Sequence, residues 1–435
     1  MKQRLERYFE FERLQTNWRT EIVAGATTFV TMAYIIFVNP SILRETGMPF
    51  GALVAATCLC AAFGSVLMGA YARYPIALAP GMGLNAYFTY TVVKGLGVPW
   101  QVALGAVFIS GVIFLLLTFA GVRQLIVSAI PKELYAAVAS GIGLFIALIG
   151  LRNAGIVVPS PATMVTLGNL RDPQTLLALF GLLVTAALLA REVRAAMLIG
   201  VLATTALGAG LGLVQWEPGS FALAELGATA FQLDIWGAWQ LGAVDIIFVF
   251  LFVDLFDNIG TLVAVGTKAG IFDETNRIPR LDRILFTDAS ATVAGSVAGT
   301  STVVSYIESA AGVVAGGRSG VTAIVTGLLF LLALFVAPLA GAIPAAATAP
   351  ALILVGSMVA THMAEIDWAD KVVAIPAFLT IVAIPLTFSI ANGIAFGFTM
   401  FTFLCVMAGR RDRVNWLMYG LSALFLLRFL YLGAA

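Results

Sequence analysis

Charged residues are scarce in this chain. Only 11% of its 435 residues are Asp, Glu, Lys or Arg, whereas 60% are apolar. An ordinary soluble domain has about 25% charged residues, so a soluble protein of this length could not cover its surface with so few. The net charge of +1 indicates neither a nucleic-acid partner nor an acidic one. The composition therefore predicts a protein whose surface lies largely in the lipid bilayer.

Cysteine and histidine are also rare. The cysteines Cys58, Cys60 and Cys405 all lie within apolar runs. Their odd number and their positions argue against a disulfide framework and against a metal site. The only histidine, His362, lies at the end of an apolar run, where we interpret it as an interfacial residue rather than a proton relay. We expect neither a metal nor a cofactor.

Long apolar runs fill most of the sequence. From about residue 20 onward we count about fourteen runs that could each cross roughly 30 Å of hydrocarbon as a helix. Lys and Arg are retained on the cytoplasmic side of membranes. With a cytoplasmic N-terminus, the external loops contain few basic residues, namely Arg44, Lys94, Arg152 and Arg171. We therefore predict an all-α, multi-pass protein of the plasma (inner) membrane with its N-terminus in the cytoplasm.

The C-terminal segment, residues 410–435, has two interpretations. Its part from Trp416 to Leu432 is apolar except for Arg428. Such a stretch fits either a fifteenth span or a helix that lies at the membrane interface. We prefer the interfacial helix, because it keeps both termini in the cytoplasm.

Two parts of the sequence resemble one another at a constant spacing. Ile130-Pro131 precedes Gly143 and Ala147, and Ile343-Pro344 precedes Gly356 and Ala360, an offset of 356 − 143 = 213. An odd number of expected spans separates the two copies, which reverses their direction and predicts two inverted seven-helix repeats. Chance similarity among Ala, Gly and Pro is the alternative.

Two spans should be interrupted at membrane depth. The third span contains Pro80, Gly81 and Gly83, which disfavour a continuous helix. The tenth begins with the Thr- and Val-rich stretch 300–304, which favours an extended strand. Irregular backbone in a membrane is tolerated where it is buried or lines a cavity. We predict two short strands that pair with one another, each followed by a half-helix, and a binding site beside them.

Acidic residues inside the spans need an explanation, because a charge at mid-membrane costs at least about 2.5 kcal/mol. Asp254 and Asp257 lie three residues apart and share one face of the eighth span. Glu308 follows the break in the tenth span, and Asn85 occupies the matching place in the third. We interpret all four as binding residues. The structural alternatives are a bonded aspartate pair, a capping box from Ser305 to Glu308, and a helix cap at Asn85.

These side chains suit one class of solute. Carboxylates accept hydrogen bonds from N–H donors at the edge of a planar heterocycle, and nearby aromatic rings can cover its face. The candidate aromatic residues are Phe88, Phe252, Phe256 and Tyr306. Two neighbouring carboxylates cannot both ionise cheaply in a low dielectric. A proton can therefore accompany the solute, with Asp254 and Glu308 as the candidates to carry it.

Four stretches of this sequence resemble the azaguanine-type purine permeases, a branch of the nucleobase–cation symporter-2 superfamily that is related to the bacterial uracil permease. They are Glu21–Phe29 (EIVAGATTF), Leu78–Phe88 (LAPGMGLNAYF), Phe252–Thr261 (FVDLFDNIGT) and Gly299–Ser309 (GTSTVVSYIES). The likeness extends over nearly the whole chain, apart from the apolar tail after Val414.

The resemblance implies a fold and a function. The expected fold has fourteen spans in two inverted sevens, with a core domain at 20–121 and 243–341 and a gate domain at 130–214 and 345–409, after a cytoplasmic segment at 1–19. The expected function is proton-coupled import of adenine, guanine or hypoxanthine, in a homodimer. By matching position, the purine-binding residues would be Asn85, Gly83, Asp254 and Glu308, with Asp257 in support.

Other functions remain open at this point. A carrier of the same fold could transport uracil, xanthine or an inorganic anion, although two acids in the site would repel an anion. A channel would give flux that does not saturate. An intramembrane enzyme should show a nucleophile–base pair or metal ligands, and the sequence offers neither apart from the acids.

Overall fold

The computed structural model describes residues 2–120, 130–214, 222–240, 244–269 and 278–431. Within these ranges the chain is mostly helical, as predicted. Seven of the described helices are long and apolar enough to cross a membrane, and shorter apolar helices accompany them. The chain divides into two compact units. Unit 1 is Met1–Leu116 with Gly150–Leu352, and unit 2 is Leu117–Ile149 with Ile353–Ala435.

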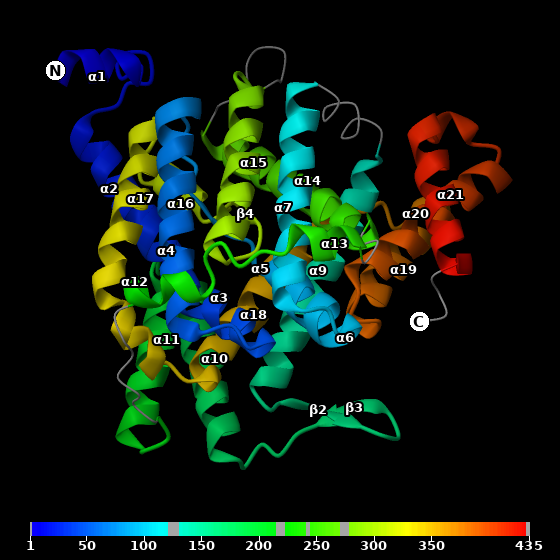
Figure 1. Cartoon of the computed structure of the whole chain (residues 1–435), viewed down its shortest axis with the longest axis horizontal. Helices are drawn as coiled ribbons and strands as arrows, with labels where there is room; N and C mark the ends of the chain where they lie inside the picture. Colours follow the sequence, from blue (N-terminus) through cyan, green and yellow to red (C-terminus); the bar gives the residue numbers. More distant parts are fainter. Residues whose placement is uncertain (1, 121–129, 215–221, 241–243, 270–277, 432–435) are drawn as a thin grey trace. The chain divides into compact units, whose positions relative to one another are not determined.

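The elements are labelled in Figure 1 in chain order. The first half contains α1 (Lys2–Tyr8), α2 (Trp18–Met32), α3 (Ile35–Leu43), α4 (Phe50–Leu67), η2 (Met68–Ala72), β1 (Leu78–Pro80), α5 (Met82–Ala86), η3 (Tyr87–Val93), α6 (Lys94–Leu96), α7 (Trp100–Phe119), α9 (Lys132–Asn153), β2 (Val157–Ser160), β3 (Met164–Leu167), α10 (Pro173–Ala190) and α11 (Ala196–Gly210). The second half contains α12 (Ala222–Glu225), α13 (Ile235–Gln240), α14 (Val244–Ala269), α15 (Leu281–Ala298), β4 (Val303–Ser305), α16 (Ser309–Val314), α17 (Gly320–Ala333), η5 (Leu334–Ala342), α18 (Ala345–Ala360), η6 (Thr361–Glu365), α19 (Lys371–Leu386), α20 (Ile390–Met407) and α21 (Trp416–Tyr431).

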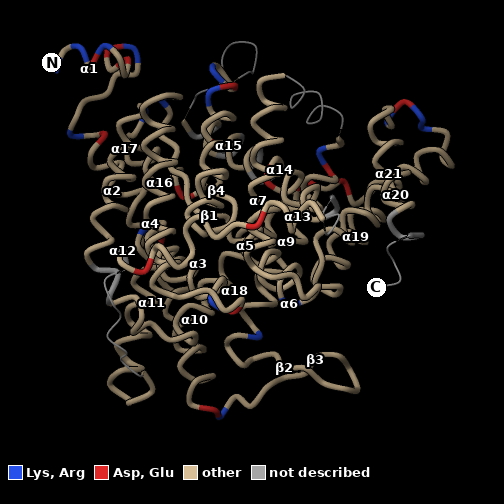
Figure 2. The backbone as a smooth tube through the Cα atoms, in the orientation of Figure 1, with Lys and Arg blue, Asp and Glu red and all other residues tan. Residues whose placement is uncertain are grey.

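Two strands of unit 1 form at the breaks that the sequence predicts. Strands β1 and β4 pair antiparallel, with Leu78 opposite Ser305 and Pro80 opposite Val303. Figure 2 labels both strands, which lie next to one another among the helices of unit 1. Each strand continues into a short helix, α5 after β1 and α16 after β4. The predicted half-helices are therefore present.

Side chains from neighbouring helices bond the outer edges of this ribbon. The Ser65 hydroxyl of α4 accepts from Leu78 N at 2.9 Å and donates to Leu78 O at 3.1 Å. The Thr292 hydroxyl of α15 does the same for Val303, at 3.2 and 3.1 Å. A buried backbone group without a partner is costly. These hydroxyls therefore let an isolated two-stranded ribbon lie inside a helical protein.

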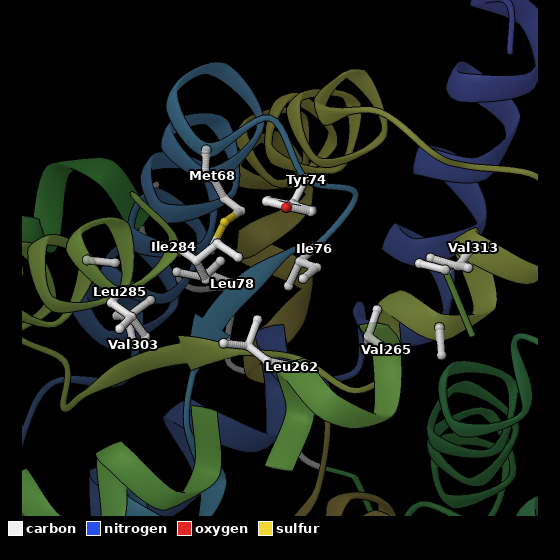
Figure 3. Packing of buried hydrophobic residues seen from close by; sticks show 14 of the residues in the cluster. Met68, Tyr74, Ile76, Leu78, Leu262, Val265, Ile284, Leu285, Val303 and Val313 are labelled. Atoms are coloured by element: carbon white, nitrogen blue, oxygen red, sulfur yellow. The ribbon is translucent and has the colours of Figure 1, made fainter. Parts of the chain in front are cut away.

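An apolar cluster packs around the strand pair (Figure 3). Leu78 of β1 and Val303 of β4 lie in it, with Met68 from η2 and Ile284 from α15. All four side chains are fully buried. Helix α4, which packs against both strands, carries no charged residue along its length (Figure 2). Helices α14 and α15, which also pack against the ribbon, carry Asp254 and Asp288.

The N-terminal segment is tied to unit 1 by an ion cluster. The Glu10 carboxylate lies 3.2 Å from Arg73, which follows η2, and 3.3 Å from Arg280, which precedes α15. All three residues have positive φ angles of 58 to 64°, which is unusual for residues other than glycine. Phe9 and Phe11 beside the cluster are buried. The segment therefore forms a packed part of the unit.

In unit 2, helices α9 and α18 cross at two glycines. A Cβ on Gly143 would lie 2.7 Å from both Gly356 O and Ala360 N. A Cβ on Gly356 would lie 2.4 Å from Gly143 O and 2.7 Å from Ala147 N. The contacts are reciprocal: each glycine meets the other glycine and the alanine four residues after it. These are the four residues that the sequence related by its constant offset.

Helix α21 packs antiparallel to α20. The Thr402 and Ser422 hydroxyls lie 2.7 Å apart, and the rings of Phe398 and Phe425 are 6.2 Å apart. Residue numbers thus rise along one helix as they fall along the other. This segment, which the sequence left between a fifteenth span and an interfacial helix, forms a helical hairpin with α20.

We predict that Gly143→Ala destabilises the protein by about 1–3 kcal/mol, because the new methyl group meets backbone atoms that cannot rotate away. Gly420→Ala in α21 is the matched control, since a Cβ there meets nothing within 4 Å. It should be neutral or stabilising by up to about 1 kcal/mol. Thermal unfolding of both variants in detergent tests this, and equal midpoints would contradict the crossing.

Candidate functional site

Glu308 stands at the start of the half-helix that follows β4. Helix α16 begins at Ser309, so Glu308 occupies the cap position and its side chain caps no backbone N–H. The capping-box alternative is wrong, because Ser305 belongs to β4 and is not a helix cap. The half-buried Glu308 carboxylate instead accepts a hydrogen bond from the Tyr34 hydroxyl at 2.6 Å.

Tyr34 comes from an interruption of the first span. Helix α2 ends at Met32 and α3 begins at Ile35. Tyr34 lies between them and is 0% exposed. The sequence analysis missed this residue, because nothing in the apolar run 22–38 marks its partner. A buried phenol needs a hydrogen-bond acceptor. That requirement is the only feature of Tyr34 in the sequence that points to a partner.

Asp254 lies on α14 and is 1% exposed. The amide nitrogen of Asn258, one turn further along, is 2.9 Å from Asp254 O and 3.3 Å from Asp254 Oδ1. The amide oxygen of Asn258 accepts a hydrogen bond from the backbone N–H of Ser305 in β4, at 3.2 Å. Asn258 therefore links Asp254 to the strand that ends three residues before Glu308. Asp257 is also on α14, but its side chain lies outside the described residues, as does that of Phe256.

A third acid, which the sequence analysis missed, joins this group. Asp288 of α15 is fully buried and accepts a hydrogen bond from the same Asn258 amide. The cost of an acid inside an apolar span, which identified Asp254, applies equally to Asp288. It was overlooked because no break or second acid lies near it in the sequence. Asn258 thus joins α14, α15 and β4.

Asn85 on α5 is fully buried within a second polar network. Its amide nitrogen donates to Asn39 of α3, and its amide oxygen accepts from Ser301, just before β4. Asn39 in turn donates to Thr57 at 2.7 Å. Gly83, half-buried on the same short helix, lies two residues before Asn85. The structure thus fixes Asn85 against the residues just before β4.

The aromatic residues expected near the site are buried. Phe88 is 0% exposed and its ring lies 6.4 Å from that of Phe250. Phe252 stacks on Phe248 at 5.2 Å. The Tyr306 hydroxyl donates to Pro80 O at 2.5 Å and so connects the two strand segments.

The carboxyl groups near the strand pair lie among neutral partners. Within the described ranges, no group of three His, Cys, Asp or Glu side chains could hold a metal ion. In the same ranges, no basic side chain pairs with Glu308. His362 pairs with the exposed Glu365 at 2.8 Å in η6. Three carboxyl groups reach the strand pair or the residues next to it, and they are held by neutral amide and phenol donors.

We predict that Asn258→Leu destabilises unit 1 by about 3 kcal/mol or more, because it leaves buried carboxylates and the Ser305 N–H without their amide partner. The control is Asn153→Leu, since Asn153 is exposed and makes only a long 3.5 Å contact with Tyr90. It should change stability by less than about 0.5 kcal/mol. Thermal unfolding midpoints in detergent measure both, and a wild-type midpoint for Asn258→Leu would contradict the bridging role.

The chain is similar to proteins from archaea and bacteria along nearly its whole length. It is 52% identical to a putative permease of Methanocaldococcus jannaschii, over 99% of each chain. It is 46% identical to the guanine/hypoxanthine permease PbuG of Bacillus subtilis, over 98% of this chain and 100% of that one. It is 44% identical to the adenine permease AdeP of Escherichia coli, over 99% of this chain and 97% of that one.

The fold has a solved counterpart. The transmembrane domain of the cyanobacterial bicarbonate transporter BicA matches with a TM-score of 0.68 at 16% identity, over 87% of this chain and 97% of that one. The chain therefore shares the fold of that domain. The sequence model of the Permease family matches residues 19–396. This match and the named relatives confirm the resemblance that the sequence motifs carry. The chain therefore belongs to the Permease family and is an integral membrane transporter rather than an enzyme.

Proposed function

We propose that this protein imports purine nucleobases across the plasma (inner) membrane by proton symport. The observation that carries the proposal is that acidic side chains from two separate parts of the chain reach one strand pair. Asp254 reaches it through Asn258, and Glu308 directly follows β4. The full-length relatives named for adenine and for guanine and hypoxanthine support purines as the solute class.

The site chemistry fits a purine edge. An ionised carboxylate has only acceptors, and a purine presents ring and exocyclic N–H donors. An amide such as that of Asn85 can both donate and accept. We assign substrate contacts to Asn85, Gly83, Asp254 and Glu308, with Asp257 in support. Uracil and xanthine also present N–H donors, so uptake assays must include them as alternative solutes for the same site.

Proton coupling follows from the cost of the buried charges. Carboxylates that share a low-dielectric region cannot all be ionised cheaply. Protonation of Asp254 or Glu308 would remove part of that cost, and the nucleobase would bind together with the proton. No metal ion or cofactor is needed in this scheme, because the coupling ion is H⁺.

We further propose fourteen spans in two inverted repeats, with a cytoplasmic N-terminus, a core domain at 20–121 and 243–341, and a gate domain at 130–214 and 345–409. Reciprocal contacts support the repeat. Gly143 meets Ala360 while Gly356 meets Ala147, which is the pattern expected of two equivalent segments around a two-fold axis. Ser65 and Thr292 bond Leu78 and Val303 in the same equivalent way. The homodimer implied by the resemblance is part of this proposal.

We predict that Asp254→Ala and Glu308→Ala each lower purine uptake by at least about 100-fold, since each removes a charged hydrogen-bond acceptor for the solute. Uptake of labelled hypoxanthine, guanine and adenine into cells or vesicles measures this, with membrane insertion checked by immunoblot. Glu365→Ala is the control, because Glu365 is exposed and bonds His362. Near-normal uptake in either site variant would refute the assigned site.

Uptake should rise as the external pH falls and collapse when a protonophore dissipates the proton gradient. A proton symporter needs both the proton and the gradient, so reconstituted vesicles with an imposed pH step give the direct measurement. Replacing sodium by choline should leave the rate unchanged. Saturable uptake that depends on sodium instead would overturn proton symport. Uptake of uracil or xanthine alone would overturn the assignment of adenine, guanine and hypoxanthine as solutes.

A further inference from the structure

Helix α2 packs closely against α16 and the residues that follow α16, with a glycine at each of two contact points. A Cβ on Gly312 would lie 2.0 Å from Thr28 Oγ1 and 2.8 Å from Ala24 O. A Cβ on Gly316 would lie 2.7 Å from Thr20 Cγ2. Residue numbers rise along α2 as they fall along α16, so the helices are antiparallel. Only glycine at position 312 allows this backbone spacing, which sets the position of the half-helix that carries Glu308.

The Tyr34–Glu308 hydrogen bond lies at one end of this interface. Tyr34 follows the last turn of α2, and Glu308 precedes the first turn of α16. The bond occupies Glu308 Oε1. Among the described residues, the carboxylate has one further hydrogen-bond donor, the backbone N–H of Glu308 itself. The titratable side chains that face Tyr34 are Glu308 and Tyr306, and the Tyr306 hydroxyl is engaged by Pro80 O.

We infer that Tyr34 is a positioning residue for nucleobase binding, acting through Glu308. This inference rests on the proposed function, because it takes Glu308 as a substrate contact. The phenol fixes Oε1 and stabilises the ionised form of the carboxylate, which burial alone would disfavour. Oε2 is then left in a defined direction to accept an N–H of the base. The first span thereby takes part in recognition without touching the solute.

The test compares Tyr34→Phe, Glu308→Gln and the double variant with the wild-type protein. Titration calorimetry of the purified proteins with guanine, hypoxanthine and adenine gives Kd. Uptake kinetics in vesicles separate KM from the maximal rate. Tyr74→Phe is the matched control, because Tyr74 is likewise buried but its hydroxyl donates to a backbone carbonyl, that of Pro279 at 2.5 Å, rather than to an acid.

Tyr34→Phe should raise Kd and KM for the preferred purine by about 10- to 100-fold, with a smaller change in the maximal rate. In the Glu308→Gln background, Tyr34→Phe should raise Kd and KM by about threefold or less, because a neutral amide forms a weaker hydrogen bond with the phenol than a carboxylate does. Tyr74→Phe should leave Kd unchanged. Gly312→Ala gives a second test: it keeps the phenol but displaces α16 from α2, and it should also raise KM.

Independent, additive effects of Tyr34→Phe and Glu308→Gln would overturn the inference, as would a wild-type Kd in Tyr34→Phe. If Tyr34→Phe does not fold, a wild-type KM in Gly312→Ala overturns it instead. These outcomes differ from failure of the proposed function, in which the wild-type protein itself binds none of the three purines.

Discussion

The antiparallel pairing of β1 with β4 is the interaction on which the rest of unit 1 depends. Inside a membrane, an extended segment without a partner leaves backbone N–H and C=O groups exposed to hydrocarbon. Each strand supplies the partner of the other, and Ser65 and Thr292 bond the outer edges. With those groups satisfied, two helices can begin in the interior of unit 1, and residues such as Glu308 can stand at their starts.

The polar residues around the strands form two networks that meet at β4. One contains Asp254, Asp288 and Asn258, and it reaches the strand through Ser305 N. The other contains Asn39 and Asn85, and it reaches the residues before β4 through Ser301. A partly satisfied buried network is more costly than an apolar core. Asp254 and Asn85, the predicted binding residues of the two networks, are therefore held by Asn258 and by Asn39 and Ser301.

The sequence predicts those parts of the site that depend on local chemistry. Pro80 with its neighbouring glycines, and the Thr- and Val-rich stretch 300–304, predict both strands, because helix breakers and β-branched residues act on their own backbone. The cost of an intramembrane acid identifies Asp254 and Glu308. Whether these residues contact a purine stays a prediction.

Long-range partners could not be predicted from the sequence. Tyr34 and Glu308 are far apart in the chain, and so are Asn258 and Asp288. No spacing rule relates such pairs, since only tertiary packing brings them together. The capping-box interpretation failed for the same reason: Ser305 fits a local helix-start pattern, but pairing with Leu78 places it in a strand.

The ion cluster at Glu10 has a consequence for how the protein matures. Glu10 and Arg280 are separated by 270 positions in the chain. The ribosome therefore releases the first ten residues long before their second arginine partner exists. Until α15 has been synthesised, the N-terminal segment can be held through Ala70 and Arg73, which bond Tyr8 and Glu10. Apolar partners of Phe9 and Phe11 on α17 are made later still. The final docking of the segment is consequently a late step of biogenesis.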